Sequence, residues 1–577
     1  MAVNRKKNIT GVLLYIAAFL LFFIAACRYR NMPWFGTDEL DIMVGGKGIA
    51  SGYRLYNDFI SQHMPVSYYI SAFFELLGFK TVLSQRICFY AFYAFFWTVI
   101  LIRFRSKVGT RVLVMYPLVF ICLTLTYDFG HAVLSEHLAG IGMVILFLEF
   151  MNYYDRCELR VVDCVLISIS VLLTFGTIFI AIFGIFIVAV GVFCREIQYS
   201  LKYRKTAGEC VRHLGKNAGK VIFACAIPWI FLIIYYRAID SLWMFFRSAY
   251  VMNREYYPKY LRENIGSIPG TILAGFEHLW KVIEECFLPE EFSIINVIYL
   301  IVIVLVVLYL VREWKTRGWL FAVISFLLIA FLSIRGVFSF HGTQAVAVIA
   351  VICSLELDEI YVSGKSSAVY EKITTPIVVL ILLLISVPFF NEVSTYAIVT
   401  QTVAEDKVKI VQSTTDEDEG IAVLVLDNSI PMLADRPVIM SAATTPWTWE
   451  CLRKKEMSKW KRNPPRVIAF DPDSYVWDSN LPVSSYAGKL VNYIEENYTK
   501  YRENIYFRND YYDEAAKKAD EALKASGMMT EETEAETETE AASEAETEAE
   551  TGTGTSSKVV AVETGTESAK TELEPAA

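Results

Sequence analysis

Three acidic residues and a histidine near the N-terminus are the side chains that could carry out acid–base chemistry. Asp38 and Glu39 are adjacent, Asp58 ends a stretch that begins at a glycine, and His63 opens a His-Met-Pro-Val-Ser-Tyr-Tyr segment. The rest of this loop, residues 28–77, consists largely of aromatic and small residues. It lies between an apolar run and an amphipathic segment. We interpret the loop 28–77 as the catalytic end of a membrane enzyme.

The elements that must position this loop are membrane helices. Of the 577 residues, 55% are hydrophobic, and they occur in runs near twenty residues long, which is the length that crosses a bilayer as a helix. We therefore predict a polytopic α-helical membrane protein. About eleven transmembrane helices are expected, at Ile9–Ala26, Val82–Ile102, Val112–Tyr127, Ala132–Met151, Val161–Thr174, Thr177–Phe193, Val221–Tyr236, Ile294–Val311, Trp319–Ile334, Phe338–Leu355 and Thr375–Phe390.

Lysine and arginine residues in the short loops predict the orientation. With eleven helices, the basic clusters near residues 5–7, 103–111, 195–220 and 312–317 all fall on one side, and that side is the cytoplasm. The N-terminus is then cytoplasmic. The loops 28–77 and 237–293 and everything after 391 are extracytoplasmic. The run 9–26 exceeds a signal-peptide core in length, so we expect a retained helix, and the architecture favours a bacterial plasma membrane.

The chain beyond the last helix changes in composition. Short β-rich runs at 421–426, 437–440, 466–470 and 504–507, with a helical stretch at 486–498, predict a small extracytoplasmic α/β domain within 396–515. Residues 516–577 form a low-complexity Glu/Thr-rich tail, expected to be disordered. Residues 530–577 hold fourteen Glu and two Lys, so the net charge of −9 hides a slightly basic remainder. The eleven cysteines show no spacing typical of a disulfide framework or zinc site.

In residues 1–395 the order of these motifs resembles the GT-C superfamily of integral-membrane glycosyltransferases, in particular the branch with the protein mannosyltransferases and the lipid A aminoarabinose transferase. The acidic pair Asp38-Glu39 in the first outer loop carries the resemblance, together with the element from Gly52 to Asp58 and the His63-x-Pro-x-x-Tyr-Tyr segment. Further along, Arg86 opens the next membrane helix, and Ser135-Glu136 lies in the second outer connection.

The resemblance implies transfer of a sugar, with inversion, from a polyprenyl-phosphate donor to a hydroxyl on an envelope lipid, polysaccharide or protein at the outer face. It implies Asp38 as general base, with Glu39 as the nearest substitute. Glu136 would bind the acceptor, orient the base or hold a metal. Positive charge for the leaving phosphate would come from Arg86, Arg335 or His341, while Tyr56, Asp58 and His63 would complete the substrate-binding set.

Simpler interpretations of the same residues stay open. The acidic pair could cap a short helix in solvent, Asp58 could form a turn, and His63 could end a loop. Glu136 and Arg335 could sit at the interface for structural reasons. The basic residues between 247 and 262 could anchor the chain at the headgroups. No metal-binding motif is evident, so the cofactor is unknown: a divalent cation is compatible with the sequence, and none is required by it. No nucleic-acid partner is expected.

Two other functions share the predicted topology. An envelope polysaccharide polymerase or ligase would use the same carrier, with its basic catalytic residues in the loop 237–293. A transporter or flippase of lipid-linked sugars would need charged residues or paired broken helices near the midplane of the membrane. A non-catalytic scaffold that acts through its C-terminal domain is a third alternative. The predicted membrane helices carry few such charges or paired broken helices, which argues against the transporter, and the intact acidic pair argues against the scaffold.

Overall fold

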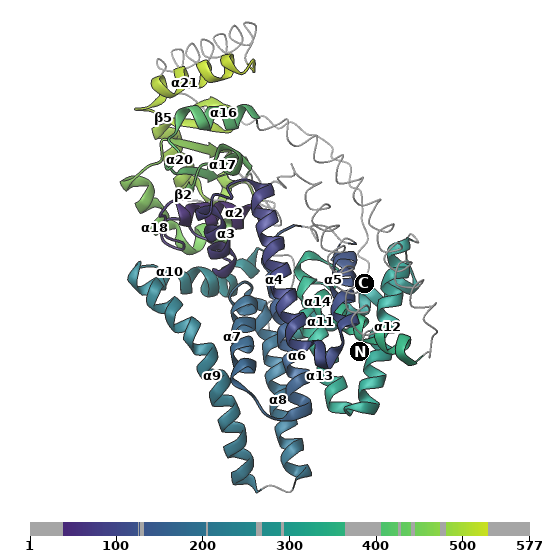
Figure 1. Cartoon of the computed structure of the whole chain (residues 1–577). Helices are drawn as coiled ribbons and strands as arrows, with labels where there is room; N and C mark the ends of the chain where they lie inside the picture. The colour runs from purple at the N-terminus through teal and green to yellow at the C-terminus, as the bar shows by residue number, and fades with distance from the viewer. Residues whose placement is uncertain are drawn as a thin grey trace, which may run out of the picture. The chain divides into compact units, whose positions relative to one another are not determined.

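The structure is a computed structural model and describes residues 38–124, 126, 132–203, 206–260, 268–289, 293–363, 405–424, 429–439, 445–473 and 481–528. The described residues up to Ala519 belong to one compact unit. Its membrane-spanning part is built of long helices (Figure 1): α4 (Val82–Val108), α5 (Thr110–Thr124), α6 (Ser135–Arg156), α7 (Val161–Phe175), α8 (Ile182–Lys202), α9 (Ala207–Ala238), α12 (Ile294–Thr316), α13 (Trp319–Leu332) and α14 (Thr343–Ser363).

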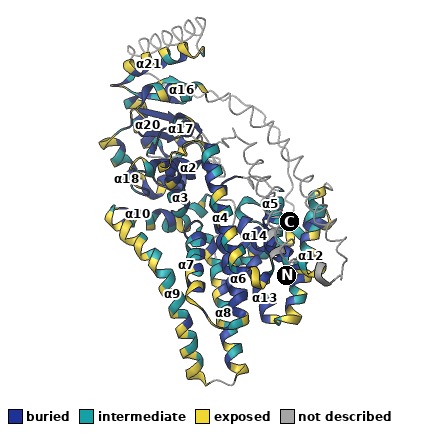
Figure 2. Cartoon of the chain, viewed as in Figure 1, coloured by how far each residue is buried: buried dark blue, intermediate teal, exposed yellow. Residues whose placement is uncertain are grey.

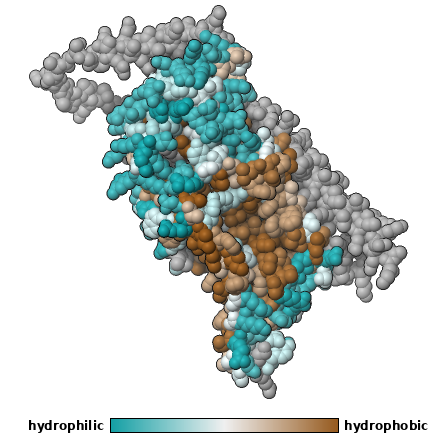
Figure 3. Space-filling view, turned by 60° about the vertical axis from the view of Figure 1, so that its left-hand side comes forward, coloured by the Kyte–Doolittle hydropathy of each residue, from teal (hydrophilic) through white to brown (hydrophobic). Residues whose placement is uncertain are grey.

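Nine of the eleven predicted spans coincide with these helices. Within the described residues, six helices are long and apolar enough to cross a membrane, and three shorter apolar helices accompany them. A hydrophobic band lies between two hydrophilic ends on the face seen in Figure 3. The first and last predicted spans, 9–26 and 375–390, lie outside the described residues, so the predicted number of helices is not confirmed.

Helix α6 is the central element of this bundle. All residues of α6 except the last two, Asp155 and Arg156, are buried, whereas most of α9 is exposed (Figure 2). Close packing on α6 depends on glycine, because a Cβ at Gly140 would come within 3.1 Å of Ala347 on α14. A Cβ at Gly142 would come within 2.8 Å of the Ser170 carbonyl oxygen on α7. Small residues at such positions let membrane helices approach one another closely. Helix α6 begins at Ser135-Glu136, which fixes this pair at one end of the bundle.

The described part of the first outer segment, residues 38–77, contains two helices. The prediction that the residues around Asp38 and Glu39 form a loop is therefore wrong. Helix α2 (Asp38–Ala50) starts at the acidic pair, and α3 (Val66–Leu76) is the predicted amphipathic segment. A Cβ at Gly45 would lie 2.6 Å from Tyr68 Cε1, and one at Gly46 would collide with Ser71. Glycine normally disfavours a helix interior, but here it allows α2 to pack directly on α3.

The C-terminal region contains a five-stranded sheet in the order β2-β1-β3-β5-β4. Strands β1 (Ile421–Leu424), β2 (Val438–Ile439) and β3 (Val467–Phe470) are parallel, whereas β4 (Tyr498–Arg502) and β5 (Ile505–Arg508) are antiparallel. Four strands and the helix α20 (Gly488–Asn497) match predicted segments, and β4 was not predicted. The other helices are α16 (Glu405–Thr414), α17 (Ser429–Ala434), α18 (Pro446–Arg462), α19 (Val483–Tyr486) and α21 (Tyr512–Ala525).

The boundaries predicted for this domain are only partly covered by the structure. The boundary at 395 lies outside the described residues. Helix α21 extends to Ala525, past the predicted start of the tail at 516. Residues 529–577, which hold most of that tail, lie outside the described residues.

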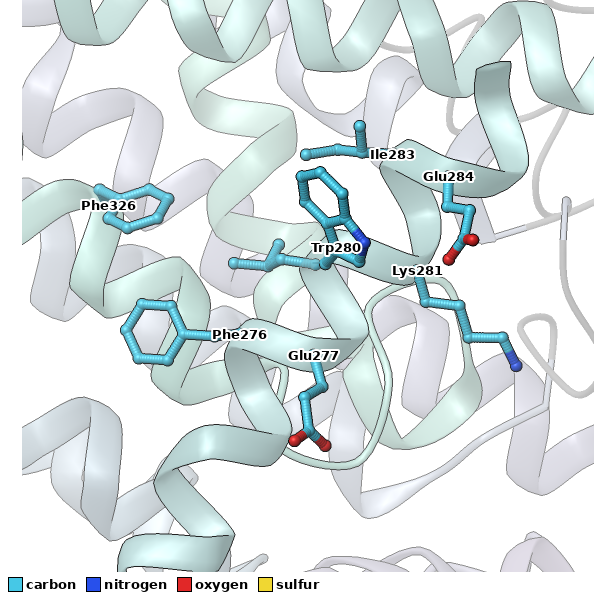
Figure 4. A pocket seen from close by; sticks show the side chains of 8 residues that line it. Phe276, Glu277, Trp280, Lys281, Ile283, Glu284 and Phe326 are labelled. Carbon is cyan, nitrogen blue, oxygen red and sulfur yellow. The ribbon is translucent and has the colours of Figure 1, made fainter. Parts of the chain in front are cut away.

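The segment 237–293 is largely helical rather than an open loop. Its elements are α10 (Leu242–Phe246), a π-helix η2 (Arg247–Tyr256), a short turn η3 (Tyr257–Lys259) and α11 (Ile268–Phe287). Helix α11 borders an open apolar hollow with Phe326 of α13 (Figure 4). Trp280, 66% exposed, lines this hollow. Together with Phe276 it gives α11 an outward apolar face of the kind that contacts lipid.

Candidate active site

Asp38 and His63 face each other at the start of α2. The first turn of α2 presents three acids, Asp38, Glu39 and Asp41, where the helix dipole favours negative charge. His63 Nε2 lies 3.8 Å from Asp38 Oδ1. Its Nδ1 lies 3.3 Å from Asp41 Oδ2. The side chains of Asp38 and His63 are each about 30% exposed, so an external group can reach the pair.

Tyr68 supports His63 from helix α3. The Tyr68 hydroxyl is fully buried and donates to Asp41. It also lies 3.2 Å from His63 Nδ1 and 2.6 Å from Ser61 Oγ. The backbone N–H of His63 donates to Ser61 Oγ over 3.0 Å. These bonds hold the imidazole with its other nitrogen directed to Asp38.

Glu136 and His341 form the opposite side of the site. His341 Nδ1 lies 3.4 Å from Glu136 Oε1, at the junction of η4 (Phe340–Gly342) and the first turn of α6. The neighbouring Ser135 donates from Oγ to Ser67 Oγ over 2.9 Å, which ties α6 to the start of α3. The second oxygen, Glu136 Oε2, is buried and has no hydrogen-bond partner among the described residues. A buried carboxylate oxygen without a donor is costly, so it is suited to receive one from a ligand.

The surroundings of Asp38 and His63, the two central groups of the site, raise the pKa of both side chains, for different reasons. Burial raises the pKa of Asp38, and the negative charges of Glu136 and Asp41 raise it further, while His63 and His341 oppose the shift. For His63, burial lowers the pKa, but the charges of Asp38 and Asp41 outweigh burial and raise it to about 9. The arrangement therefore holds an imidazolium at neutral pH beside a carboxylate of raised basicity.

Glu39 and Arg86 form a buried ion pair with each other. Their side chains are almost fully buried, and Arg86 donates from Nε and Nη2 to the two Glu39 oxygens over 2.7 and 2.6 Å. Val133 N–H donates to Glu39 Oε1 over 3.0 Å. The two side chains, predicted as a substitute base and a phosphate ligand, are therefore engaged with each other in this structure. The pair instead links α2, α4 and the residues before α6.

The remaining residues predicted for the site are Tyr56, Asp58 and Arg335, and they differ in how close they lie to the acid–histidine cluster. Tyr56, fully buried, donates to the His63 carbonyl oxygen over 2.6 Å, so it shapes the loop behind His63. The Asp58 carboxylate accepts from the backbone and guanidinium of Arg54 over 2.8 to 2.9 Å, which is the turn-forming alternative. Arg335 lies in the turn before η4, where its carbonyl oxygen accepts from Ser339. Its guanidinium has no ion-pair partner among the described residues.

Sequence reasoning missed Asp41 and the role of Tyr68. Asp41 follows Asp38 by three residues, a spacing that places both on one helix face. The three-residue spacing is informative only if a helix is expected to begin at Asp38. The glycines in the sequence of α2 disfavour such a helix. Among the described residues, no three His, Cys, Asp or Glu side chains are grouped so as to hold a metal ion.

Comparison with known proteins shows a similarity in fold to solved structures. No protein-family model matches the sequence, and no curated protein sequence matches it. Among solved structures, ArnT from Cupriavidus metallidurans bound to undecaprenyl phosphate superposes with a TM-score of 0.53 at 12% identity, over 79% of this chain and 93% of that one. The apo state of ArnT from the same organism superposes with a TM-score of 0.49 at 13% identity, over 80% and 93%.

The chain therefore has the fold of a GT-C membrane protein, as the sequence resemblance predicted. More narrowly, it is similar in fold to the aminoarabinose transferase ArnT. With the apolar helices described above, this fold makes the chain a multi-pass membrane protein.

Proposed function

We propose that the protein is a glycosyltransferase that takes a sugar from a polyprenyl-phosphate carrier and transfers it, with inversion, to a cell-envelope acceptor at the outer face of the membrane. The observation that carries the proposal is the acid–histidine cluster of Asp38, His63, Glu136 and His341, located within a fold shared with ArnT. The ArnT structure contains undecaprenyl phosphate, which supports a carrier of this class.

In this proposal Asp38 is the general base. Its raised pKa makes it a stronger base than an ordinary aspartate, and the exposed edge of its side chain lets an acceptor hydroxyl approach. As the hydroxyl oxygen attacks the anomeric carbon, its proton passes to Asp38 while the bond to the carrier phosphate breaks. His63 in its imidazolium form stabilises the carboxylate before proton transfer, and Asp41 with Tyr68 positions His63.

Glu136 and the cationic groups have separate roles. The free oxygen of Glu136 accepts a hydrogen bond from a hydroxyl or amine of the bound substrate. Arg335 supplies positive charge to the leaving phosphate, and His341, which contacts Glu136, is the second residue assigned to it. In this proposal Glu39 is not a substitute base, and Arg86 and Asp58 are not part of the substrate-binding set, because their charges are already paired within the protein.

Contacts in the segment 237–293 weigh against the polymerase or ligase alternative. Arg247 donates to the Cys451 carbonyl oxygen over 2.9 Å, and Arg254 contacts Tyr250. These arginines are therefore engaged in packing interactions rather than directed together toward one site.

The experiment uses purified protein in sealed vesicles without an ion gradient, supplied with a panel of labelled polyprenyl-phospho-sugars and envelope acceptors. Transfer of label to an acceptor, with release of polyprenyl phosphate, supports the proposal. Movement of the intact lipid-linked sugar across the vesicle without transfer would instead establish the flippase alternative.

A further inference from the structure

The C-terminal α/β region contacts segment 38–77 at several polar points, and one of these contacts adjoins the acid–histidine cluster. Trp447, at the start of α18, donates from Nε1 to Gln62 Oε1 over 2.8 Å. Asn253 of η2 donates to the Gln62 carbonyl oxygen over 2.7 Å. Gln62 is the residue directly before His63, so its side chain and backbone are both fixed one peptide unit from the imidazole.

A second contact holds the helix that carries Asp38. Lys47 on α2 is buried, with a side chain 6% exposed, and it pairs with Glu75 of α3 at 3.3 Å and with Asp435 of the C-terminal region. Asp435 adopts a positive φ of 58° at the end of α17, a conformation that aspartate tolerates better than most residues. Lys80 also lies 3.6 Å from Asp435. A buried lysine needs compensating negative charge. One of the two carboxylates that pair with Lys47, that of Asp435, comes from the C-terminal region.

Further bonds extend the same interface. Tyr53 donates to the Asp418 carbonyl oxygen over 3.2 Å, and Lys455 donates to Asn57 Oδ1 over 2.9 Å. Trp447 also packs edge-on against Tyr257 at 4.8 Å between ring centroids. The C-terminal region thus contacts segment 38–77 along its length, from α2 to Gln62.

We propose that the C-terminal α/β region positions the active site, through the Trp447–Gln62 hydrogen bond next to His63 and the Asp435–Lys47 ion pair in the last turn of α2, the helix that begins at Asp38. This inference rests on the proposed function for its catalytic consequence, and Trp447 and Asp435 are positioning residues within it. Neither contacts the reacting groups. Their effect is to restrict segment 38–77 to the conformation in which His63 faces Asp38, and a small misplacement of such groups is costly in rate.

The test compares two conservative variants in the full chain, each with a matched control. Trp447→Phe removes the indole N–H and keeps an aromatic ring, and its control is Trp243→Phe, at an exposed position on α10. Asp435→Asn removes the charge, and its control is Glu417→Gln, an exposed acid in the same region. Lys47 keeps Glu75 in the Asp435 variant, so the protein is expected to fold.

The first readout is independent of activity. Amide hydrogen exchange of peptides covering residues 38–63 is expected to accelerate about fivefold to tenfold in both variants, since each loses a partly buried polar contact. The controls are expected to exchange like the wild type. Unchanged exchange in the two variants would overturn the proposal.

The second readout is kinetic. We expect kcat to fall by about tenfold to a hundredfold with KM for the donor changed less than about twofold, because the contacts lie outside the binding groups. Asp435→Glu, which restores the charge, is expected to recover most of the loss. Faster exchange without any fall in kcat would contradict a role in catalysis. If the wild type itself transfers no sugar, the proposed function fails, and the exchange comparison alone decides whether the C-terminal region holds segment 38–77.

Discussion

Substitutions that break the Glu39–Arg86 ion pair test whether Glu39, the acid next to Asp38, has a structural or a catalytic role. In Glu39→Gln, the buried guanidinium of Arg86 loses the carboxylate that it contacts, although the side chain at position 39 keeps its size. Removing one member of a buried ion pair typically destabilises a protein by about 3–5 kcal/mol. The two short bonds from Arg86 and the bond from Val133 N–H place this pair at the upper part of that range.

The single variant Arg86→Met and the double variant complete a double-mutant cycle with Glu39→Gln. Arg86→Met leaves the Glu39 carboxylate buried, and a loss of similar size is expected. The double variant Glu39→Gln/Arg86→Met removes both charges of the pair and loses mainly the hydrogen bonds between the two side chains, about 1–3 kcal/mol. The double variant is therefore expected to be more stable than either single variant. The coupling energy should reach at least about 2 kcal/mol.

The assay is a reversible denaturant titration in mixed micelles, combined with sugar transfer per folded molecule. Glu284→Gln, at an exposed position on α11, is the control for the loss of a carboxylate. Folded Glu39→Gln is expected to retain transfer within about tenfold of the wild type, because Glu39 does not touch the substrate. Normal stability combined with a loss of transfer of about a thousandfold would refute this reasoning and make Glu39 a catalytic residue.

Further predictions concern pH and packing. Transfer is expected to rise with pH as Asp38 ionises. In His63→Gln this rise should move to higher pH in the pH–rate profile, because the variant lacks the positive charge that lowers the pKa of Asp38. Because the folded pKa of His63 is raised, its stabilising contribution is complete below pH 6.5 and is lost as pH rises through about 9, which unfolding titrations at pH 6 and pH 10 can measure. Gly46→Val should place Cβ against Ser71 on α3 and cost about 1–3 kcal/mol in the same titration, whereas a neutral result would contradict the close packing of α2 on α3.

Much of the fold could be predicted from the sequence, because lipid-facing helices and buried strands leave strong local signals. The apolar runs from Val82 to Leu355 became helices, and the short β-branched runs at 421, 437, 466 and 504 became strands. The helix from Asp38 to Ala50 was missed for a physical reason. Its three glycines lower helix propensity, and the gain that compensates for them is tertiary packing on α3, which no local pattern reports.

The candidate site was predictable in its members but not in their pairing. Asp38, His63, Glu136 and His341 come from separate segments, and the structure brings them into one electrostatically coupled cluster. The pairing of Arg86 with Glu39 could not be read from the sequence, because their contact depends on how α4 packs against α2. The contact between Trp447 and Gln62 spans 385 residues and likewise follows from tertiary structure alone.

The central claim is that Asp38 is the base of a polyprenyl-phosphate-dependent sugar transfer. The most direct measurement is single-turnover transfer of labelled sugar from a donor that the wild type uses, by wild-type protein and by Asp38→Asn at equal folded concentration. A loss of at least about a hundredfold, with donor binding retained, is the predicted result. Transfer at the wild-type rate in Asp38→Asn would contradict the account.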